Sequence, residues 1–86
     1  MSKQSSAAER RHMGRVSELP CVACGNHGVH VHHIREERIK DNFLVIPLCP
    51  GCHLGDFSIH MAKRQFENIY GSELHLLAQT IEQLSR

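Results

Sequence analysis

The chain has 86 residues and a formal net charge of +1 at pH 7, with ten Lys and Arg against nine Asp and Glu. This length predicts one domain with a small core, and the near-neutral charge excludes a globally basic nucleic-acid-binding chain. The eight histidines and four cysteines are the informative part of the composition, because both residue types bind metals.

The polar start of the chain, residues 1–10, lacks the apolar run of a signal peptide, and no stretch is long enough to span a membrane. We therefore expect a reduced, cytoplasmic protein without a membrane partner. In such a protein, paired cysteines are more typical of a metal site than of disulfides.

The first predicted element is a helix over residues 7–19, capped by Ser5 or Ser6 and ended by Pro20. Residues 1–6 are expected to be disordered. The apolar stripe of the helix over residues 7–19 is weak and consists of Met13, Val16 and Leu19.

Two short apolar runs follow and predict an antiparallel hairpin. Residues 29–34 are rich in β-branched side chains and predict a strand, whereas the charged residues 35–42 predict a loop. Residues 43–46 form the second run, which Pro47 closes.

Two further helices complete the expected fold. The first covers residues 58–70, with Gly71 at the C′ position, and Ser72 caps the last one. The expected apolar faces are Ile59, Ala62, Phe66 and Ile69 on the first, and Leu74, Leu77, Ala78, Ile81 and Leu84 on the last. We expect the last stripe to pack on the domain's own core. The pattern predicts a single α+β domain over residues 1–86.

Two Cys-x-x-Cys pairs flank the predicted hairpin. Each tight turn can direct two thiolates at one metal, and two such turns give the closed tetrahedral coordination of a structural zinc. Zinc would then tie the two ends of the hairpin together. The four predicted ligands are Cys21, Cys24, Cys49 and Cys52.

Histidines gather on the first strand and after the second cysteine pair. His32 and His33 are neighbours on a strand and should face opposite sides, so one can hold a metal while the other reaches a water molecule. Gly55 interrupts the segment between His53 and His60, so these two need not be collinear and can converge on a metal held by His32. The other histidines are expected at the surface or in hydrogen bonds, and these are His12, His27, His30 and His75.

The order of these motifs over about residues 20–60 resembles the HNH endonucleases that carry a four-cysteine zinc. It runs Cys-x-x-Cys, His-His-Ile, Asn, and Pro-Leu-Cys-x-x-Cys-His. The sequences that flank this region resemble the phage and prophage recombination-enhancement (Ref-like) nucleases. They are His-Met-Gly-Arg-Val before Leu-Pro-Cys, and Phe-Ser-Ile-His leading to Phe66 and Tyr70-Gly71. The resemblance implies a small zinc-stapled ββα-metal (His-Me finger) domain with flanking N- and C-terminal helices.

The resemblance also implies roles for single residues. His32 matches a metal ligand, His33 the general base, and Asn42 a residue that braces the loop by hydrogen bonds. His53 matches a further ligand of the catalytic divalent ion, and whether His53 or His60 is the main ligand stays open. The family suggests Mg²⁺, whereas imidazole ligands favour Zn²⁺, Ni²⁺ or Cu²⁺.

The implied activity is metal-dependent hydrolysis of DNA phosphodiester bonds, with DNA as partner. The subfamily resemblance suggests a bacterial host cell and a recombinase as a further partner. Phosphate contacts are expected from Arg35, Arg38, Lys63 and Arg64. Two alternatives stay open, a non-enzymatic zinc module that binds DNA or protein, and a thiol redox protein.

Overall fold

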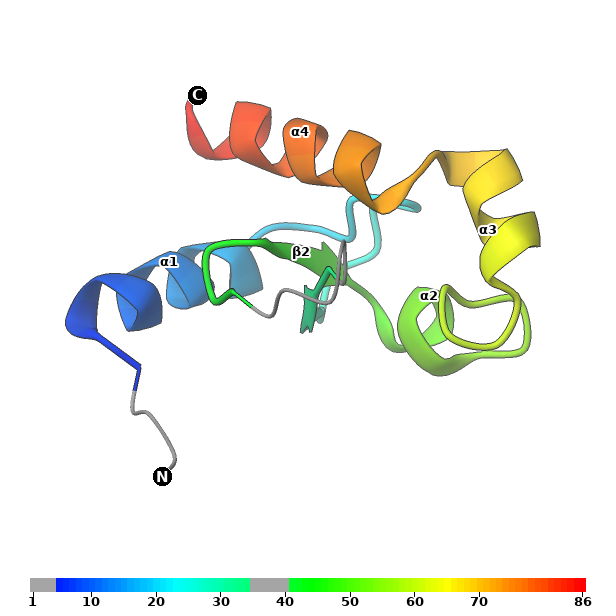
Figure 1. The fold of residues 1–86 in the computed structure, drawn as a ribbon, viewed down its shortest axis with the longest axis horizontal. Coiled ribbons are helices and arrows are strands. Elements are labelled where there is room, and N and C mark those ends of the chain that lie inside the picture. The colour runs from blue at the N-terminus through cyan, green and yellow to red at the C-terminus, as the bar shows by residue number, and fades with distance from the viewer. Residues whose placement is uncertain (1–4, 35–40) are drawn as a thin grey trace.

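The computed structural model describes residues 5–34 and 41–86 (Figure 1). Within these residues the elements are α1 (Ala7–Ser17), β1 (His30–His33), β2 (Val45–Leu48), α2 (Pro50–Leu54), α3 (Lys63–Tyr70) and α4 (Glu73–Leu84). The predicted α+β class is confirmed. α1 and α4 pack on the two-stranded sheet and on each other, and α2 contacts both strands at the opposite end. No helix in the described ranges is long and apolar enough to cross a membrane.

α1 begins at a capping box, as its sequence allows. The Ser6 hydroxyl accepts from the backbone N–H of Glu9, and the Glu9 carboxylate accepts from the backbone N–H of Ser6. Ser6 is one of the two predicted caps and is the N-cap, so it is ordered although residues 1–6 were expected to be disordered; residues 1–4 lie outside the described residues. The helix ends at Ser17, before the predicted stop at Pro20, because the Glu18 N–H bonds back to Arg15 and Val16.

The hairpin is antiparallel as predicted, and its register pairs His32 with Ile46 and Val31 with Pro47. The prediction that Pro47 ends the second strand is wrong, since β2 runs through it to Leu48. The Pro47 carbonyl accepts from the Val22 N–H, so this residue turns its backbone polar side away from β1. Its missing N–H therefore removes no bond from the ladder, and proline is tolerated there.

The helix predicted over residues 58–70 starts late. Residues 55–62 form turns, in which the buried Ser58 hydroxyl accepts from the Met61 N–H, and α3 begins only at Lys63. Gly71 ends it with a φ of +105°, as predicted. The Cys49–Cys52 segment is likewise no simple turn, because Cys49 is the N-cap of α2 and Pro50 occupies its first turn.

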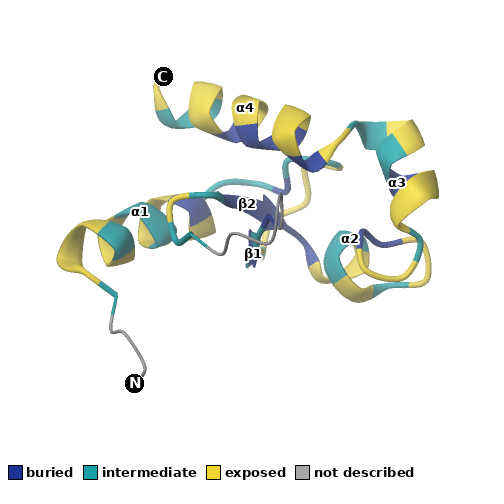
Figure 2. Ribbon diagram, in the orientation of Figure 1, coloured by how far each residue is buried: buried dark blue, intermediate teal, exposed yellow. Residues whose placement is uncertain are grey.

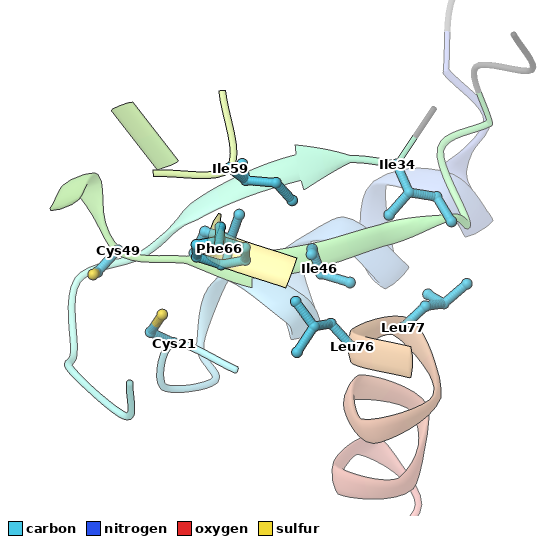
Figure 3. Packing of buried hydrophobic residues seen from close by; sticks show 9 residues of the cluster. Cys21, Ile34, Ile46, Cys49, Ile59, Phe66, Leu76 and Leu77 are labelled. Atoms are coloured by element: carbon cyan, nitrogen blue, oxygen red, sulfur yellow. The ribbon is translucent and has the colours of Figure 1, made fainter. Parts of the chain in front are cut away.

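The core lies between the hairpin, α3 and α4 (Figure 3). The face of α4 that packs into the core differs from the predicted apolar stripe, because Leu74 and Ile81 of that stripe are 53% and 51% exposed. In Figure 2 the buried side of α4 faces the sheet. The four buried residues of α4 are Glu73, Leu76, Leu77 and Thr80. Two of the four are polar, so hydrophobicity alone could not identify this face.

Candidate functional site

The two cysteine pairs meet at one end of the hairpin. Their four sulfur atoms all lie within 4.8 Å of one another, and the sulfurs of Cys24 and Cys49 are 3.5 Å apart. A tetrahedral zinc with Zn–S bonds of about 2.3 Å requires sulfurs about 3.8 Å apart, which this cluster fits. The predicted grouping of Cys21, Cys24, Cys49 and Cys52 is confirmed, and the cluster is compatible with structural zinc.

The electrostatics of this cluster favour a thiolate. Burial opposes ionisation of Cys49, but hydrogen bonds from the Cys52 backbone and from the neighbouring thiols outweigh it and lower the Cys49 pKa to about 7. Burial, and next the charge of Cys21, raise the pKa of Cys52. One thiolate therefore suppresses the ionisation of a neighbour, and a divalent cation would remove that conflict.

Three histidines form a second group of potential metal ligands. One ring nitrogen from each of His32, His53 and His60 falls within 4.8 Å of the other two. His32 is buried on β1, His53 lies in α2, and His60 lies in the turn that follows. The segment between His53 and His60 is irregular, as Gly55 predicts, and this lets the two side chains converge on His32.

A lowered pKa favours the uncharged form of two of these imidazoles, which is the form that binds metals. Burial lowers the pKa of His32, and this effect outweighs the hydrogen bond and charge of Glu73, which act in the opposite direction. Burial and the neighbouring histidines lower the pKa of His53 to about 4. Among the described residues this group offers three potential ligands, one fewer than a closed four-coordinate site.

His30 is exposed and hydrogen-bonded, as predicted, and its hydrogen bond places it next to this group of three histidines. Its Nδ1 lies 2.9 Å from Nδ1 of His53, and the two rings meet edge to face. The sequence indicates that His30 lies on the same side as His32, because the two are two residues apart on a strand and so share a face. The remaining histidines lie apart from this group; His12 bonds the Phe43 carbonyl, and His27 and His75 are exposed.

His33 faces the opposite side of β1, as strand alternation predicts. Its Nε2 lies 2.8 Å from Asn42 Oδ1, and the Asn42 amide donates to Glu9 Oε2 at 3.0 Å. A carboxylate can only accept, so Glu9 orients the amide with its oxygen toward His33. Nε2 of a neutral His33 then carries the hydrogen and Nδ1 keeps its lone pair. Asn42 thus links His33 to the start of α1, and Glu9 is a residue that sequence reasoning missed.

His32, His53 and His60 are called the triad below. Next to the triad lies a pocket of about 90 Å³, which is lined by His32, Ile59, His60, Lys63 and Glu73. The Lys63 ammonium lies 3.7 Å from Glu73 Oε1 while the side chain stays 57% exposed. Lys63 therefore lies next to the candidate metal site, and Arg64 is exposed at the start of α3. Arg35 and Arg38, also predicted to contact phosphate, lie outside the described residues.

Glu73 is the other residue that sequence reasoning missed. Its Oε2 lies 2.8 Å from Nε2 of His32, and both side chains are 5% exposed. The two residues are 41 positions apart in the chain, and no local pattern links them.

A comparison with known families gives a match over nearly the whole chain. A family model described as "Protein of unknown function (DUF968)" matches residues 1–85. A comparison with curated proteins gives no match.

Proposed function

The chain belongs to the DUF968 family, and because the function of that family is unknown, we propose from the site itself that the protein is a metal-dependent DNA endonuclease of the HNH class. The observation that carries the proposal is the triad of His32, His53 and His60 at the hairpin end, with His33 next to it in sequence and on the other face of β1. A zinc module needs the cysteines alone and gives no reason for three converging imidazoles.

The finer fold assignment is part of the same proposal. The β1–β2 hairpin together with α2 would be the ββα-metal unit, with the triad between the strand and the helix. Zinc on the four cysteines would fix the ends of the hairpin, because Cys21 and Cys24 precede β1 and Cys49 and Cys52 follow β2. α1 and α4 would flank this unit and support it. The link to phage recombination and to a recombinase rests on the sequence resemblance alone.

His32, His53 and His60 would hold the catalytic divalent ion. Bound there, the ion supplies Lewis-acid activation of the scissile phosphate and stabilises the departing oxygen. The all-imidazole donor set suits Zn²⁺, Ni²⁺ or Cu²⁺ better than Mg²⁺, which prefers oxygen ligands.

His33 would act as the general base. The lone pair on Nδ1 takes a proton from water, and the water oxygen attacks the phosphorus as the bond to the leaving oxygen breaks. Asn42 keeps Nε2 protonated and the ring in place, and Glu9 keeps the amide of Asn42 in the orientation this requires. The three residues form a chain that presents one tautomer of His33 to the substrate.

We expect DNA binding to be electrostatic and largely independent of sequence, because the described residues offer phosphate-binding cations but no helix with a base-reading pattern. Replacing Lys63 and Arg64 together with alanine should weaken binding to unrelated duplexes alike, and reduce the salt dependence of affinity by about 0.9 per lost phosphate contact. Fluorescence anisotropy over a salt series, in a His33→Ala background that does not cut, measures both.

Arg86→Ala is the matched control for that pair, because Arg86 is a cation engaged by Glu82 within α4, and it should leave the salt dependence unchanged. A strong preference for one sequence that persists at high salt would contradict a backbone-binding mode.

The proposed activity is tested by incubating supercoiled plasmid with the zinc-loaded protein and Mg²⁺, Mn²⁺ or Zn²⁺. The expected result is conversion to nicked circles, stopped by a chelator and restored by excess divalent ion. Metal content discriminates the alternative, since a non-enzymatic zinc module holds one tight zinc, whereas a nuclease also holds a second, weaker and exchangeable ion. Absence of nicking with every ion would count against the nuclease.

A further inference from the structure

We propose that Glu73 is a positioning residue for the metal site, which holds the ring of His32 by its Nε2–H so that Nδ1 is the nitrogen that faces the ion. The inference rests on the proposed metal site. It extends that site from the hairpin to α4, an element outside the ββα unit.

The choice of nitrogen follows from hydrogen-bond chemistry. Nε2 of His32 lies 2.8 Å from Glu73 Oε2, and an ionised carboxylate only accepts hydrogen bonds. Nε2 therefore carries the hydrogen and has no lone pair for a metal, which leaves Nδ1. Glu73 does not belong to the group of ligand atoms that lie within 4.8 Å of one another, so among the described residues it acts behind the ligand and does not coordinate.

Glu73 is only 4% exposed, and three features of its surroundings complement a carboxylate. The Lys63 ammonium lies 3.7 Å from its second oxygen, and His32 donates to the first. Glu73 also lies in the first turn of α4, which Ser72 caps, where the helix dipole favours a negative charge. A carboxylate so supported is an effective acceptor for a ligand histidine, and such partners orient the ring and raise its basicity as a ligand.

Packing alone does not require a carboxylate at this position. Glu73 shares the buried face of α4 with Leu76 and Leu77, where an apolar side chain would pack without burying a charge. Burying a carboxylate costs free energy unless it is paired and hydrogen-bonded, and a well-packed apolar residue carries no such cost. The presence of a glutamate at position 73 is therefore better explained by its hydrogen bond with His32 than by the stability of α4.

The test compares Glu73→Leu and Glu73→Gln with Glu82→Leu, which removes an exposed carboxylate from the other side of the same helix. Calorimetric titration with Co²⁺ of the zinc-loaded protein measures the triad, and the ¹⁵N shifts of the His32 ring report which nitrogen is protonated in the absence of Co²⁺. Glu73→Leu should weaken Co²⁺ binding about 10- to 100-fold and lose the preference for the Nε2–H form. Glu73→Gln, which still offers an acceptor oxygen, should keep that form and lose less affinity.

Glu82→Leu should match the parent in both measurements, and the zinc content of the cysteine site checks that each variant is folded. If Glu73→Leu folds, binds Co²⁺ like the parent and keeps Nε2 protonated, the proposal is overturned. Should Glu73→Leu not fold, parent-like Co²⁺ affinity in Glu73→Gln together with a mixed tautomer overturns it equally. A parent that binds no Co²⁺ at the triad refutes the proposed nuclease site, and the ring shifts of the metal-free protein then still decide whether Glu73 fixes His32.

Discussion

Replacing His33 with alanine should cut plasmid hydrolysis by roughly 10²–10⁴-fold, the usual contribution of a positioned general base. Zinc content, thermal unfolding and divalent affinity should stay close to those of the parent, because His33 faces away from the triad and bonds only Asn42 among the contacts described. DNA binding should also survive, since His33 makes no required phosphate contact in this scheme. Nicking rates and divalent-ion titrations on the same preparations measure all of these.

His32→Ala is the matched variant, because it removes the neighbouring imidazole from the opposite face of the same strand. It should weaken divalent binding, and excess metal should restore part of the activity, whereas no metal concentration should rescue His33→Ala. Cleavage by His33→Ala at the parent rate would show that another group is the base. Identical behaviour of the two variants would contradict the division of roles.

Cys49→Ser should abolish zinc binding and cooperative unfolding together. Cys49 is buried, has the lowered thiol pKa and lies within 4.8 Å of the other three sulfurs, so its loss leaves zinc an incomplete site. Structural zinc supplies on the order of 10 kcal/mol to the folding of small zinc domains, more than the whole stability of most chains of this size. Zinc content and a thermal unfolding curve on the purified variant measure the two losses.

Ser17→Ala provides the control for Cys49→Ser, since Ser17 is an exposed residue at the end of α1 and its change should affect neither measurement. A Cys49→Ser protein that unfolds cooperatively without zinc would show that the cysteines are not a structural centre.

The parts of this fold that the sequence predicted well are those with a local cause. Ser6 and Ser72 cap helices because a hydroxyl can accept from a backbone N–H a few residues ahead, and Gly71 ends α3 because only glycine adopts its φ easily. The opposite orientation of His32 and His33 follows from the pleat of a strand. The Cys-x-x-Cys spacing alone predicted that the four cysteines form one group, and Gly55 predicted the irregular segment between His53 and His60.

The parts that it predicted poorly depend on contacts between distant segments. The buried face of α4 contains Glu73 and Thr80, and their burial makes sense only with His32 and the Leu76 carbonyl as partners. Glu9 was visible as half of a capping box, but its bond to Asn42 joins residues 33 positions apart. Pro47 stays within β2 because its carbonyl meets Val22, which no pattern around Pro47 reveals.

The most direct test of the proposed site compares His53→Ala with His27→Ala in plasmid nicking over a range of Mn²⁺ concentrations. His53 contributes a ring nitrogen to the triad, whereas His27 is an exposed histidine outside it, so the pair separates the site from the mere presence of histidines. The account predicts that His27→Ala nicks like the parent, and that His53→Ala loses most activity and needs far more Mn²⁺ for what remains. Nicking by His53→Ala at the parent rate and the parent Mn²⁺ requirement would contradict it.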